Sequence, residues 1–328
     1  MKYELLEAEV RGVLGRRECA HCNGVMFQFV KTCHRCEAPA VTTGEAPARS
    51  LDKPTGARRI AHLSDLHLGV SRKGPSPLDV LRAWLEVYRD VGADGVAVSG
   101  DIVETHNDVA SLTAARRSLD DSRMPWVVTP GNHDVCTPGI PGHFERTFGE
   151  YPRRQRVGGV DFALVDSNAG LPVRERTWLE QGFMMLKCPT EGRVGKEQMT
   201  DFDADIGQSD AFIPRVLVLH HHLVHQSPDP VVPWLPFLKE DAIGTMAVLQ
   251  DADALRDWAV RAGVRVVLHG HKHRIQRAGY HGKDLLVLNA GSSTKSVSSD
   301  ASIHRYVART VDLLPSGERR VSTLQLML

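Results

Sequence analysis

The sequence predicts a layered α/β protein with parallel strand pairing. Its 328 residues suffice for one large domain or two ordinary ones. From residue 58 onward, short apolar runs recur that are typical of strands buried on both faces. Stretches of helical periodicity lie between several of these runs. This alternation favours parallel sheets covered by helices.

The predicted strands are short and rich in β-branched and aliphatic residues: Arg59–Ser64, Gly95–Ser99, Trp126–Thr129, Val160–Asp166, Arg215–His220, Val264–His269 and Leu285–Asn289. Apolar residues three and four apart predict helices over Pro77–Val91, Val109–Leu119 and Asp251–Ala262. The last segment, Tyr306–Leu328, alternates as antiparallel strands do, a pattern compatible with closing a second sheet.

Three segments are predicted along the chain. Residues 1–37 hold four of the six cysteines and are predicted to be a small separate module. Residues 38–57 are rich in Ala, Pro, Thr and Gly without apolar periodicity, which is typical of a linker. Residues 58–328 form the large domain.

Composition excludes some classes of function. Lys+Arg and Asp+Glu both number 40, so the formal net charge is zero. This argues against a broad electrostatic surface for nucleic acid or anionic membranes. No apolar run approaches the roughly 20 residues that span a bilayer. The N-terminus lacks the basic start and apolar core of a secretory signal, so we expect a cytoplasmic protein without a membrane partner.

Potential metal ligands occur in five short motifs, each directly after an apolar run. The motifs are Asp65-Leu66-His67, Gly100-Asp101, Gly131-Asn132-His133-Asp134, His220-His221-His222 and Gly270-His271-Lys272-His273. In extended backbone, residues i and i+2 point to the same side, so Asp65 and His67 are expected to reach one metal, as are His271 and His273. Taken singly each motif means little, but five in order predict a metal site at the strand ends.

The candidate ligands are Asp65, His67, Asp101, Asn132, His220, His271 and His273. This mixture of oxygen and nitrogen donors suits Mn²⁺, Fe or Zn²⁺. Seven ligands are too many for one catalytic ion that keeps a position open for water. Two ions that share the carboxylate of Asp101 fit the number, and such a pair is the usual device for displacement at phosphorus.

His133 lies beside the candidate ligand Asn132 but is not needed as a ligand itself. It is the candidate that protonates the leaving oxygen, and Asp134 is expected to orient its ring.

The motif series resembles the calcineurin-like metallophosphoesterase superfamily, whose pattern is D-x-H, G-D, G-N-H-D/E, H and G-H-x-H. The resemblance spans roughly residues 58 to 295 and implies a four-layer αββα sandwich with a dinuclear site at the strand ends. It implies that Asp65, His67, Asp101 and His273 hold one metal and that Asp101, Asn132, His220 and His271 hold the other. It also implies that His133 meets the phosphate and the leaving group.

The second motif departs from the protein Ser/Thr phosphatases of this superfamily, which continue it as G-D-x-x-D-R-G. Here Glu104 and Thr105 follow Asp101-Ile102-Val103, so the phosphate-clamping Arg is absent. The sequence looks more like the bacterial cyclic-nucleotide phosphodiesterase branch. The resemblance puts the ligand of the histidine triplet at His220, with His221 as the alternative.

Two C-x₂-C pairs lie in the N-terminal segment, the first formed by Cys19 and Cys22 and the second by Cys33 and Cys36. Two such pairs can supply four thiolates in a tetrahedron, and the segment resembles a small zinc ribbon. A structural zinc is favoured over reduced thiols, because so small a module has too little core without it. The module is compatible with nucleic-acid contact, protein docking or a purely structural role.

The leading hypothesis is a dinuclear-metal phosphohydrolase that cleaves phosphodiesters of nucleotides by attack of a metal-bridging hydroxide. A nuclease that uses the same site, with the zinc module contacting DNA or RNA, is the alternative. A phosphomonoesterase is a third reading. A non-catalytic scaffold is a different class, but it predicts eroded ligands, and none of the seven is eroded.

Overall fold

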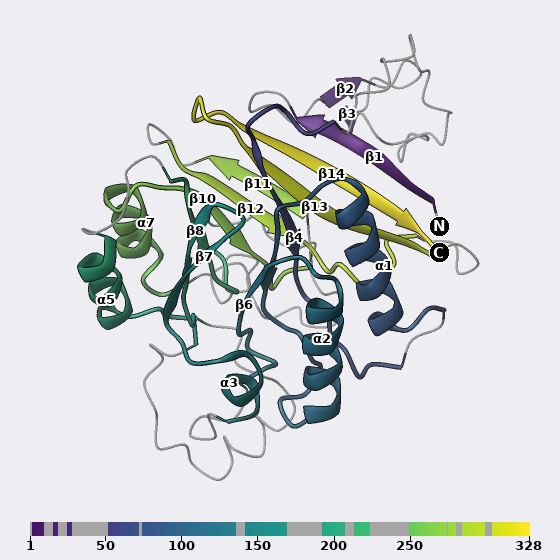
Figure 1. Ribbon diagram of the computed structural model, residues 1–328, viewed down its shortest axis with the longest axis horizontal. Coiled ribbons are helices and arrows are strands. Elements are labelled where there is room, and N and C mark those ends of the chain that lie inside the picture. Colours follow the sequence, from purple (N-terminus) through teal and green to yellow (C-terminus); the bar gives the residue numbers. More distant parts are fainter. Residues whose placement is uncertain are drawn as a thin grey trace, which may run out of the picture.

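The computed structural model describes residues 2–9, 16–18, 25–27, 52–71, 74–135, 142–168, 192–206, 213–223, 249–273, 275–279, 284–298 and 304–328. Within these residues the chain forms two six-stranded sheets flanked by helices (Figure 1). The predicted fold class is thereby confirmed.

The predicted zinc module falls mostly outside this description. A separate antiparallel pair is formed by β2 (Arg16–Glu18) and β3 (Val25–Phe27). All four predicted zinc ligands, Cys19, Cys22, Cys33 and Cys36, lie outside the described residues. The zinc site therefore stays a prediction from the sequence.

The first sheet has the order β1-β14-β13-β4-β5-β6. Its strands are β1 (Lys2–Glu9), β4 (Arg58–Leu63), β5 (Gly95–Ser99), β6 (Trp126–Thr129), β13 (Arg305–Leu313) and β14 (Arg319–Met327). Strands β4, β5 and β6 are parallel, whereas β13, β14 and β1 add antiparallel on one side. Strand β1 therefore extends the sheet of the large domain, although residues 1–37 were predicted to form a separate module.

The second sheet has the order β11-β12-β10-β9-β8-β7. Its strands are β7 (Arg153–Val157), β8 (Val160–Leu164), β9 (Arg215–Val218), β10 (Val264–His269), β11 (Ile275–Gly279) and β12 (Leu286–Ala290). The four central strands are parallel, and the two edge strands are antiparallel to their neighbours. The parallel strands, buried on both faces, are those that the apolar runs predicted.

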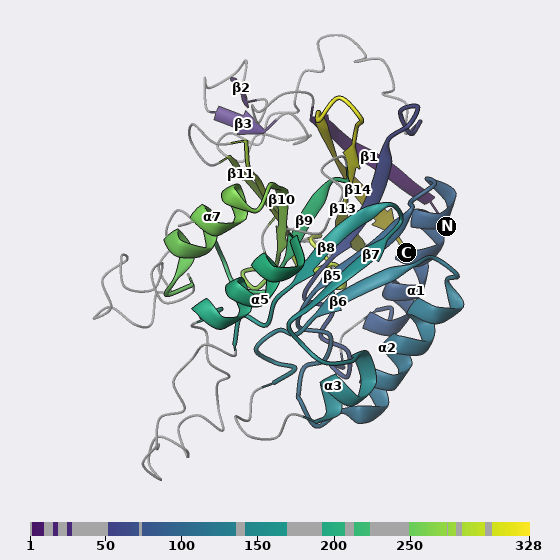
Figure 2. The same ribbon diagram turned by 60° about the vertical axis from the view of Figure 1, so that its left-hand side comes forward.

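Helices cover the outer faces of both sheets. The first sheet is flanked by α1 (Pro77–Asp90), α2 (Val109–Asp121) and α3 (His143–Phe148), and the second by α5 (Lys196–Ile206) and α7 (Ala252–Arg261). The two sets of helices lie on opposite sides of the molecule, and the turned view shows the sheets stacked between them (Figure 2). Among the described residues, no helix has the length and apolar character needed to cross a membrane.

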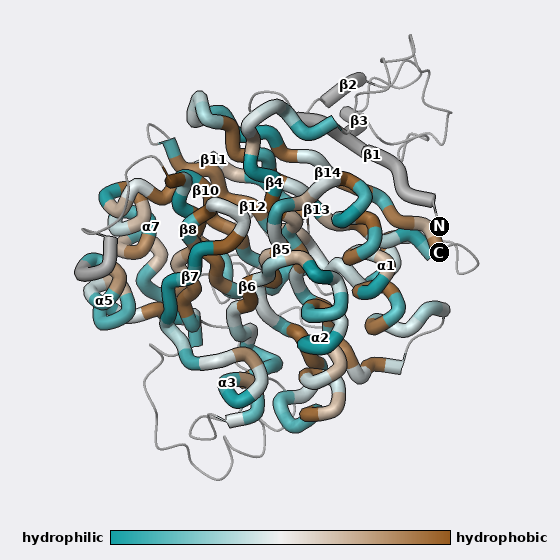
Figure 3. Tube along the Cα trace, in the orientation of Figure 1, coloured by the Kyte–Doolittle hydropathy of each residue, from teal (hydrophilic) through white to brown (hydrophobic). Residues whose placement is uncertain are grey.

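Three buried apolar clusters hold the layers together. One fills the space between the sheets and includes Ile60, Phe162 and Val218. The other two lie between a sheet and its helices. Apolar residues concentrate in the strands, while the helices alternate between apolar and hydrophilic (Figure 3). Each sheet therefore buries both faces, which explains why its central strands show no polar alternation.

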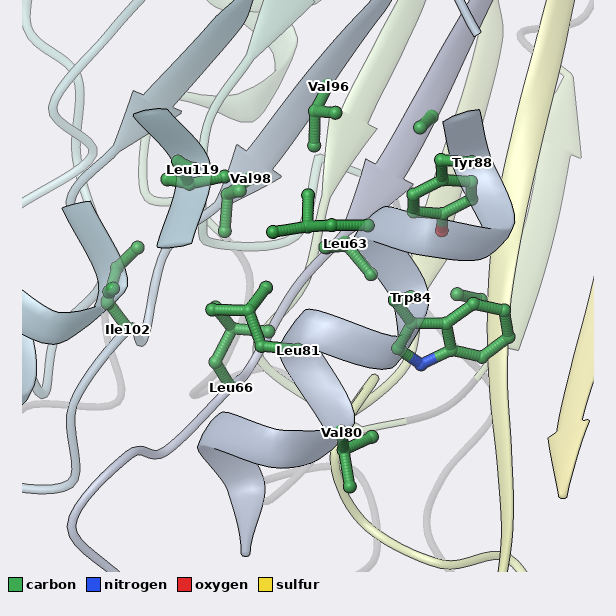
Figure 4. Close-up of a cluster of buried hydrophobic side chains, with 14 of the residues drawn as sticks. Leu63, Leu66, Val80, Leu81, Trp84, Tyr88, Val96, Val98, Ile102 and Leu119 are labelled. Carbon is green, nitrogen blue, oxygen red and sulfur yellow. The ribbon is translucent and has the colours of Figure 1, made fainter. Parts of the chain in front are cut away.

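Helix α1 shows how sequence periodicity becomes packing. The Ser76 hydroxyl accepts a hydrogen bond from the Asp79 N–H at 3.2 Å and caps the helix. Leu81, Trp84 and Tyr88 then lie on the buried face of the helix, toward the first sheet (Figure 4). The Trp84 Nε1–H donates to the Ser293 carbonyl at 2.8 Å, so the buried indole keeps a hydrogen bond.

The structure also differs from the sequence expectations at the ends. The strands within 306–328 are antiparallel as predicted, but they extend the first sheet and do not close the second. Strands β7 and β11 and helices α3 and α5 were not predicted. Both strands are at sheet edges and carry polar, partly exposed side chains, so they lack the apolar signal of the central strands.

A buried ion pair joins β4 to β13 beneath α1. Arg59 and Asp312 are register partners, and the guanidinium donates to both carboxylate oxygens at 2.7 and 2.8 Å. Arg59 also donates to the Val91 carbonyl at 2.6 Å, and both charged residues are almost fully buried. The pair fixes the position at which the antiparallel extension joins the parallel strands.

We expect Arg59→Met to lower the free energy of unfolding by about 3–5 kcal/mol, because it leaves the Asp312 carboxylate buried without its partner. The double variant Arg59→Met/Asp312→Leu should recover most of this loss. The control Arg58→Met, at an exposed neighbouring position, should change it by less than about 0.5 kcal/mol. Urea unfolding measures all three, and a loss below about 1 kcal/mol for the single variant would contradict the assignment.

Candidate metal centre

The loops that follow five strands converge at one place between the two sheets. Asp65 and His67 follow β4, and Asp101 follows β5. Their loops pair directly, since the Asp65 N–H donates to the Gly100 carbonyl at 3.1 Å and the His67 N–H donates to the Asp101 carbonyl at 2.9 Å. Asn132 follows β6 in the same sheet. In the second sheet, His220 follows β9, and His271 and His273 follow β10.

Five of the candidate ligands have left-handed backbone conformations: Asp65 (φ 52°), His67 (φ 46°), Asp101 (φ 51°), His271 (φ 80°) and His273 (φ 51°). Among the described residues, the sixth non-glycine with positive φ is Arg123. The expectation that the i, i+2 pairs converge in extended backbone is therefore wrong in its geometry, although the side chains do converge. Such conformations cost about 1–3 kcal/mol each and cluster at functional sites.

The first group of ligand atoms comes from Asp65, His67, Asp101 and His273. His67 Nε2 lies 2.9 Å from His273 Nε2, and His273 Nε2 lies 3.3 Å from Asp65 Oδ1. Asp101 Oδ2 lies 3.7 Å from His67 Nε2. The four side chains each present one ligand atom, all within 4.8 Å of one another.

The second group is formed by Asp101, Asn132, His220 and His271. His220 Nε2 lies 3.2 Å from Asp101 Oδ2 and 3.1 Å from Asn132 Oδ1. His271 Nδ1 lies 3.0 Å from Asn132 Oδ1 and 3.2 Å from His220 Nε2. The structure thus brings all seven predicted residues together, and Asp101 belongs to both groups.

The separations between donor atoms fit divalent ions. Ligands about 2.1 Å from one ion, at angles between about 90° and 109°, are about 3.0–3.4 Å apart. Most of the close pairs in both groups fall in or near this range. The donors are carboxylate and amide oxygens and imidazole nitrogens, which suit Mn²⁺, Fe or Zn²⁺. The residues present therefore fit a pair of ions.

Charge within the site is balanced between Asp101 and His220. Burial opposes ionisation of Asp101, but the adjacent His220 outweighs it and lowers the pKa of Asp101. Burial also opposes protonation of His220, yet the carboxylate raises the pKa of His220 to about 9. Burial and the charge of His220 lower the pKa of His271 to about 3. The pair therefore holds a proton where a bound cation would replace it.

Two glycines allow the loops after β5 and β6 to touch. Gly100 has φ 84°, and a Cβ there would lie 2.6 Å from His220 Nδ1. A Cβ on Gly131 would lie 2.2 Å from Asp101 Oδ1 and 2.3 Å from Asp101 N. Only residues without a side chain permit this approach, so the glycines of both motifs set the position of Asp101.

His133 and Asp134 are placed differently from one another. The His133 backbone N–H donates to Asp101 Oδ1 at 2.9 Å, and its Nδ1 lies 2.8 Å from the Glu104 carbonyl oxygen. The Asp134 carboxylate instead accepts the backbone N–H groups of Gly131, Ile102 and Val103. The expectation that Asp134 orients the His133 ring is therefore wrong: the Glu104 carbonyl does so, while Asp134 ties the third motif to the second.

Burial and the negative charge of Asp101 raise the pKa of Asp134 to about 7, while its three backbone N–H partners act in the opposite direction. Its hydrogen bonds need an acceptor, which favours the carboxylate form. The role that the structure supports for Asp134 is to fix the loop that presents Asn132 and His133.

Glu104 was not predicted as part of the site. Its carboxylate Oε2 lies 2.8 Å from His67 Nδ1, and its backbone carbonyl contacts His133. The sequence offered one signal, an acidic residue three positions after Asp101. No periodicity of the surrounding residues distinguishes it from an ordinary exposed loop residue. Ser99 was also missed, although its carbonyl oxygen lies 2.8 Å from His220 Nδ1.

The three histidines of the triplet lie in three different environments. Of the three, His220 is the one that joins the second ligand group. His221 is fully buried, and its Nδ1 lies 2.7 Å from Ser167 Oγ. The ring of His222 lies 5.0 Å from that of His269 and 5.6 Å from that of His271, centroid to centroid. This geometry favours His220 over the alternative His221 as a ligand.

The family model described as calcineurin-like phosphoesterase matches residues 58–274. The chain belongs to this family. The match confirms the predicted enzyme class, a metal-dependent phosphoester hydrolase, for the domain of residues 58–274.

Known proteins resemble this chain at low sequence identity. A Bos taurus transmembrane protein with metallophosphoesterase domain is 25% identical over 119 residues, which cover 36% of this chain and 26% of that protein. A dimetal phosphatase from Danio rerio has a TM-score of 0.56 at 14% identity, over 82% of this chain and 98% of that one. TT1561 of Thermus thermophilus has a TM-score of 0.48 at 13% identity, over 81% and 98%. At such identities the Danio rerio structure shows the fold alone.

We expect Gly131→Ala to weaken Mn²⁺ binding at least about tenfold, because the new Cβ displaces the Asp101 carboxylate. The matched control is Gly279→Ala in β11, where a Cβ meets nothing within 4 Å, and it should bind Mn²⁺ like the parent. Calorimetric titration with Mn²⁺ measures the affinity, and thermal unfolding checks that both variants fold. Unchanged Mn²⁺ affinity in Gly131→Ala would contradict the role assigned to this contact.

Proposed function

We propose that this phosphoesterase is a dinuclear enzyme that cleaves phosphodiester bonds of nucleotides. The observation that carries the proposal is the membership of the Asp101 carboxylate in both ligand groups. A shared carboxylate supports two adjacent ions, the arrangement used for displacement at phosphorus. Resemblance of the motif spacing to the cyclic-nucleotide phosphodiesterase branch supports the substrate class.

In this proposal, Asp65, His67, Asp101 and His273 hold one ion, and Asp101, Asn132, His220 and His271 hold the other. When bound, the two ions supply Lewis-acid activation of water and neutralise charge on the phosphoryl oxygens. The chain contributes the fixed geometry. Because the left-handed loops are tied by backbone hydrogen bonds, the donors are held in place before an ion arrives.

His133 is proposed to protonate the leaving oxygen. A carbonyl oxygen can only accept, so the contact with the Glu104 carbonyl places the imidazole proton on Nδ1. Nε2 is then the nitrogen available to the substrate, and in the imidazolium form it carries the proton that the leaving alkoxide needs. The His133 N–H to Asp101 bond sets the distance between this ring and the ligand groups.

The charge near the site supports a diester over a monoester. A phosphomonoester carries about −1.5 to −2 at pH 7, whereas a diester carries a single negative charge. Thr105 stands where the protein Ser/Thr phosphatases have the phosphate-clamping Arg, and Glu104, with 44% of its side chain exposed, stands at the acidic position before it. The absence of this clamp beside a partly exposed carboxylate disfavours the more highly charged substrate.

An assay with Mn²⁺ on bis(p-nitrophenyl) phosphate, p-nitrophenyl phosphate, cyclic nucleotides and labelled single- and double-stranded DNA tests the proposal. Faster turnover of the diester and of a cyclic nucleotide than of the monoester is expected. Preferred cleavage of the monoester would contradict the proposal and indicate a phosphomonoesterase. Preferred cleavage of polymeric DNA would favour the nuclease reading.

We expect His133→Asn to lower kcat on the best diester by about 10²–10⁴-fold, because the proton donor is lost. Bound Mn²⁺ per chain should not change, since His133 is outside both ligand groups in this proposal. His143→Asn in α3 is the matched control and should keep full activity. Steady-state kinetics with metal analysis gives both readouts, and a His133→Asn variant as active as the parent would rule out the role.

The four N-terminal cysteines remain a proposed structural zinc site, formed by Cys19, Cys22, Cys33 and Cys36. Nucleic-acid contact is one role for such a module, and it would support the nuclease alternative. Zinc content of the parent and of the double variant Cys19→Ser/Cys22→Ser tests the site directly. A cytoplasmic location likewise remains a proposal.

A further inference from the structure

Glu104 is an acidic residue whose side chain contacts a candidate ligand, His67, without belonging to either ligand group. Its backbone is fixed, because the Glu104 N–H donates to the Leu68 carbonyl at 3.0 Å and an isolated bridge pairs Leu68 with Val103. These contacts bind the loop after β5 to the loop that carries His67. The carboxylate therefore starts from a backbone position already in register with His67.

The carboxylate then turns toward the outer nitrogen of His67. Glu104 Oε2 lies 2.8 Å from His67 Nδ1, on the side of the ring opposite Nε2, which faces His273. The contact lies off the ring N–H direction, so it is a close polar contact and not an aligned hydrogen bond. The His67 side chain is 4% exposed and that of Glu104 44%, so water reaches the acid but hardly reaches the imidazole.

This contact matters because it affects which ring nitrogen of His67 carries the proton. A neutral imidazole carries one N–H, and a ligand nitrogen must present its lone pair. An acceptor beside Nδ1 keeps the proton there and leaves Nε2 free for the ion of the first group. Carboxylates commonly hold ligand histidines in this way and fix both tautomer and ring orientation.

A third ion held by His67, Glu104 and His133 is the competing reading of the same cluster, whose ligand atoms lie within 4.8 Å of one another. It would require His67 to bind through Nδ1 while Nε2 serves the first group. A neutral imidazole cannot offer both nitrogens as lone pairs. In addition, His133 Nδ1 faces the Glu104 carbonyl oxygen at 2.8 Å.

We propose that the Glu104 carboxylate is a positioning residue that orients His67 as a metal ligand. This inference rests on the proposed dinuclear function and adds a member to its site. Because His133 is held by the carbonyl of Glu104, replacing the side chain should leave the leaving-group acid in place. The effect of the side chain is therefore expected on ion binding and not on the chemical step.

Three substitutions separate acceptor, reach and charge. Glu104→Gln keeps an acceptor oxygen on a side chain of the same length but removes the charge. Glu104→Asp keeps the charge but shortens the side chain. Glu104→Ala removes the acceptor and the charge. Thr105→Ala, at the exposed neighbouring position, is the control. The first readout is the Mn²⁺ dissociation constant from electron paramagnetic resonance titration of free Mn²⁺, and the second is kcat at saturating Mn²⁺.

We expect Mn²⁺ affinity at one of the two sites to fall about 10–100-fold in Glu104→Ala and Glu104→Asp, and much less in Glu104→Gln. At saturating Mn²⁺, all three variants should regain a kcat within about threefold of the parent, because His67 still coordinates the ion once excess Mn²⁺ fills the site. Thr105→Ala should match the parent in both readouts. Thermal unfolding verifies that each variant is folded.

Equal affinities in the parent and all variants would overturn the proposal, as would a Glu104→Asp variant that binds like the parent. If the variants keep the Mn²⁺ affinity of the parent but kcat stays low at saturating Mn²⁺, Glu104 acts on the substrate instead. If the parent binds more than two Mn²⁺ per chain and Glu104→Ala loses the extra ion, Glu104 is a ligand of a third ion. If the affinity series holds while no phosphoester is cleaved, the proposed function fails alone.

Discussion

The position of the Asp101 carboxylate is the constraint on which the rest of the site depends. One oxygen accepts the His133 backbone N–H at 2.9 Å, and the other faces both His220 and His67. The Asp101 carbonyl holds the His67 backbone at 2.9 Å. A displacement of Asp101 would therefore disturb its contact with His220 from the second sheet, the position of His67 in the first sheet and the position of His133 together.

The two-sheet core stabilises this arrangement. Strands β5 and β9 lie in different sheets that share one apolar cluster, with Ala97 and Val218 on their facing sides. This rigid packing delivers Asp101 and His220 to the same point. The left-handed loops after the strands are locally unfavourable, by about 1–3 kcal/mol per residue, and persist only where surrounding packing fixes them. The buried ion pair between Arg59 and Asp312 anchors the strand that carries Asp65.

Much of the fold could be predicted from the sequence, because parallel strands buried on both faces appear as continuous apolar runs. The edge strands β7 and β11 could not, since RRQRV and IQRAG are polar and partly exposed. Alternation identified the C-terminal strands as antiparallel but did not say which sheet they join. That choice depends on register contacts such as Arg59 with Asp312, which no local pattern reveals.

The ligand types were predictable from residue chemistry and order, but the local geometry was not. Positive φ at Asp65 and His273 has no sequence signal comparable to glycine, so an extended backbone was the natural and incorrect assumption. The partners of Asp134 are backbone N–H groups, and the group that holds the His133 ring is a backbone carbonyl. Such contacts are invisible to reasoning that pairs side chains. Glu104 was missed because the pairing of two loops, which no local pattern reveals, places its side chain beside His67.

The most direct test of the central claim is the electron paramagnetic resonance spectrum of the parent protein loaded with Mn²⁺. Two ions that shared the Asp101 carboxylate would lie about 3.5–4 Å apart, so the spectrum should show spin-coupled Mn²⁺ at two ions per chain. A spectrum of isolated, uncoupled Mn²⁺ at saturation, or a stoichiometry of one, would contradict the shared-carboxylate centre.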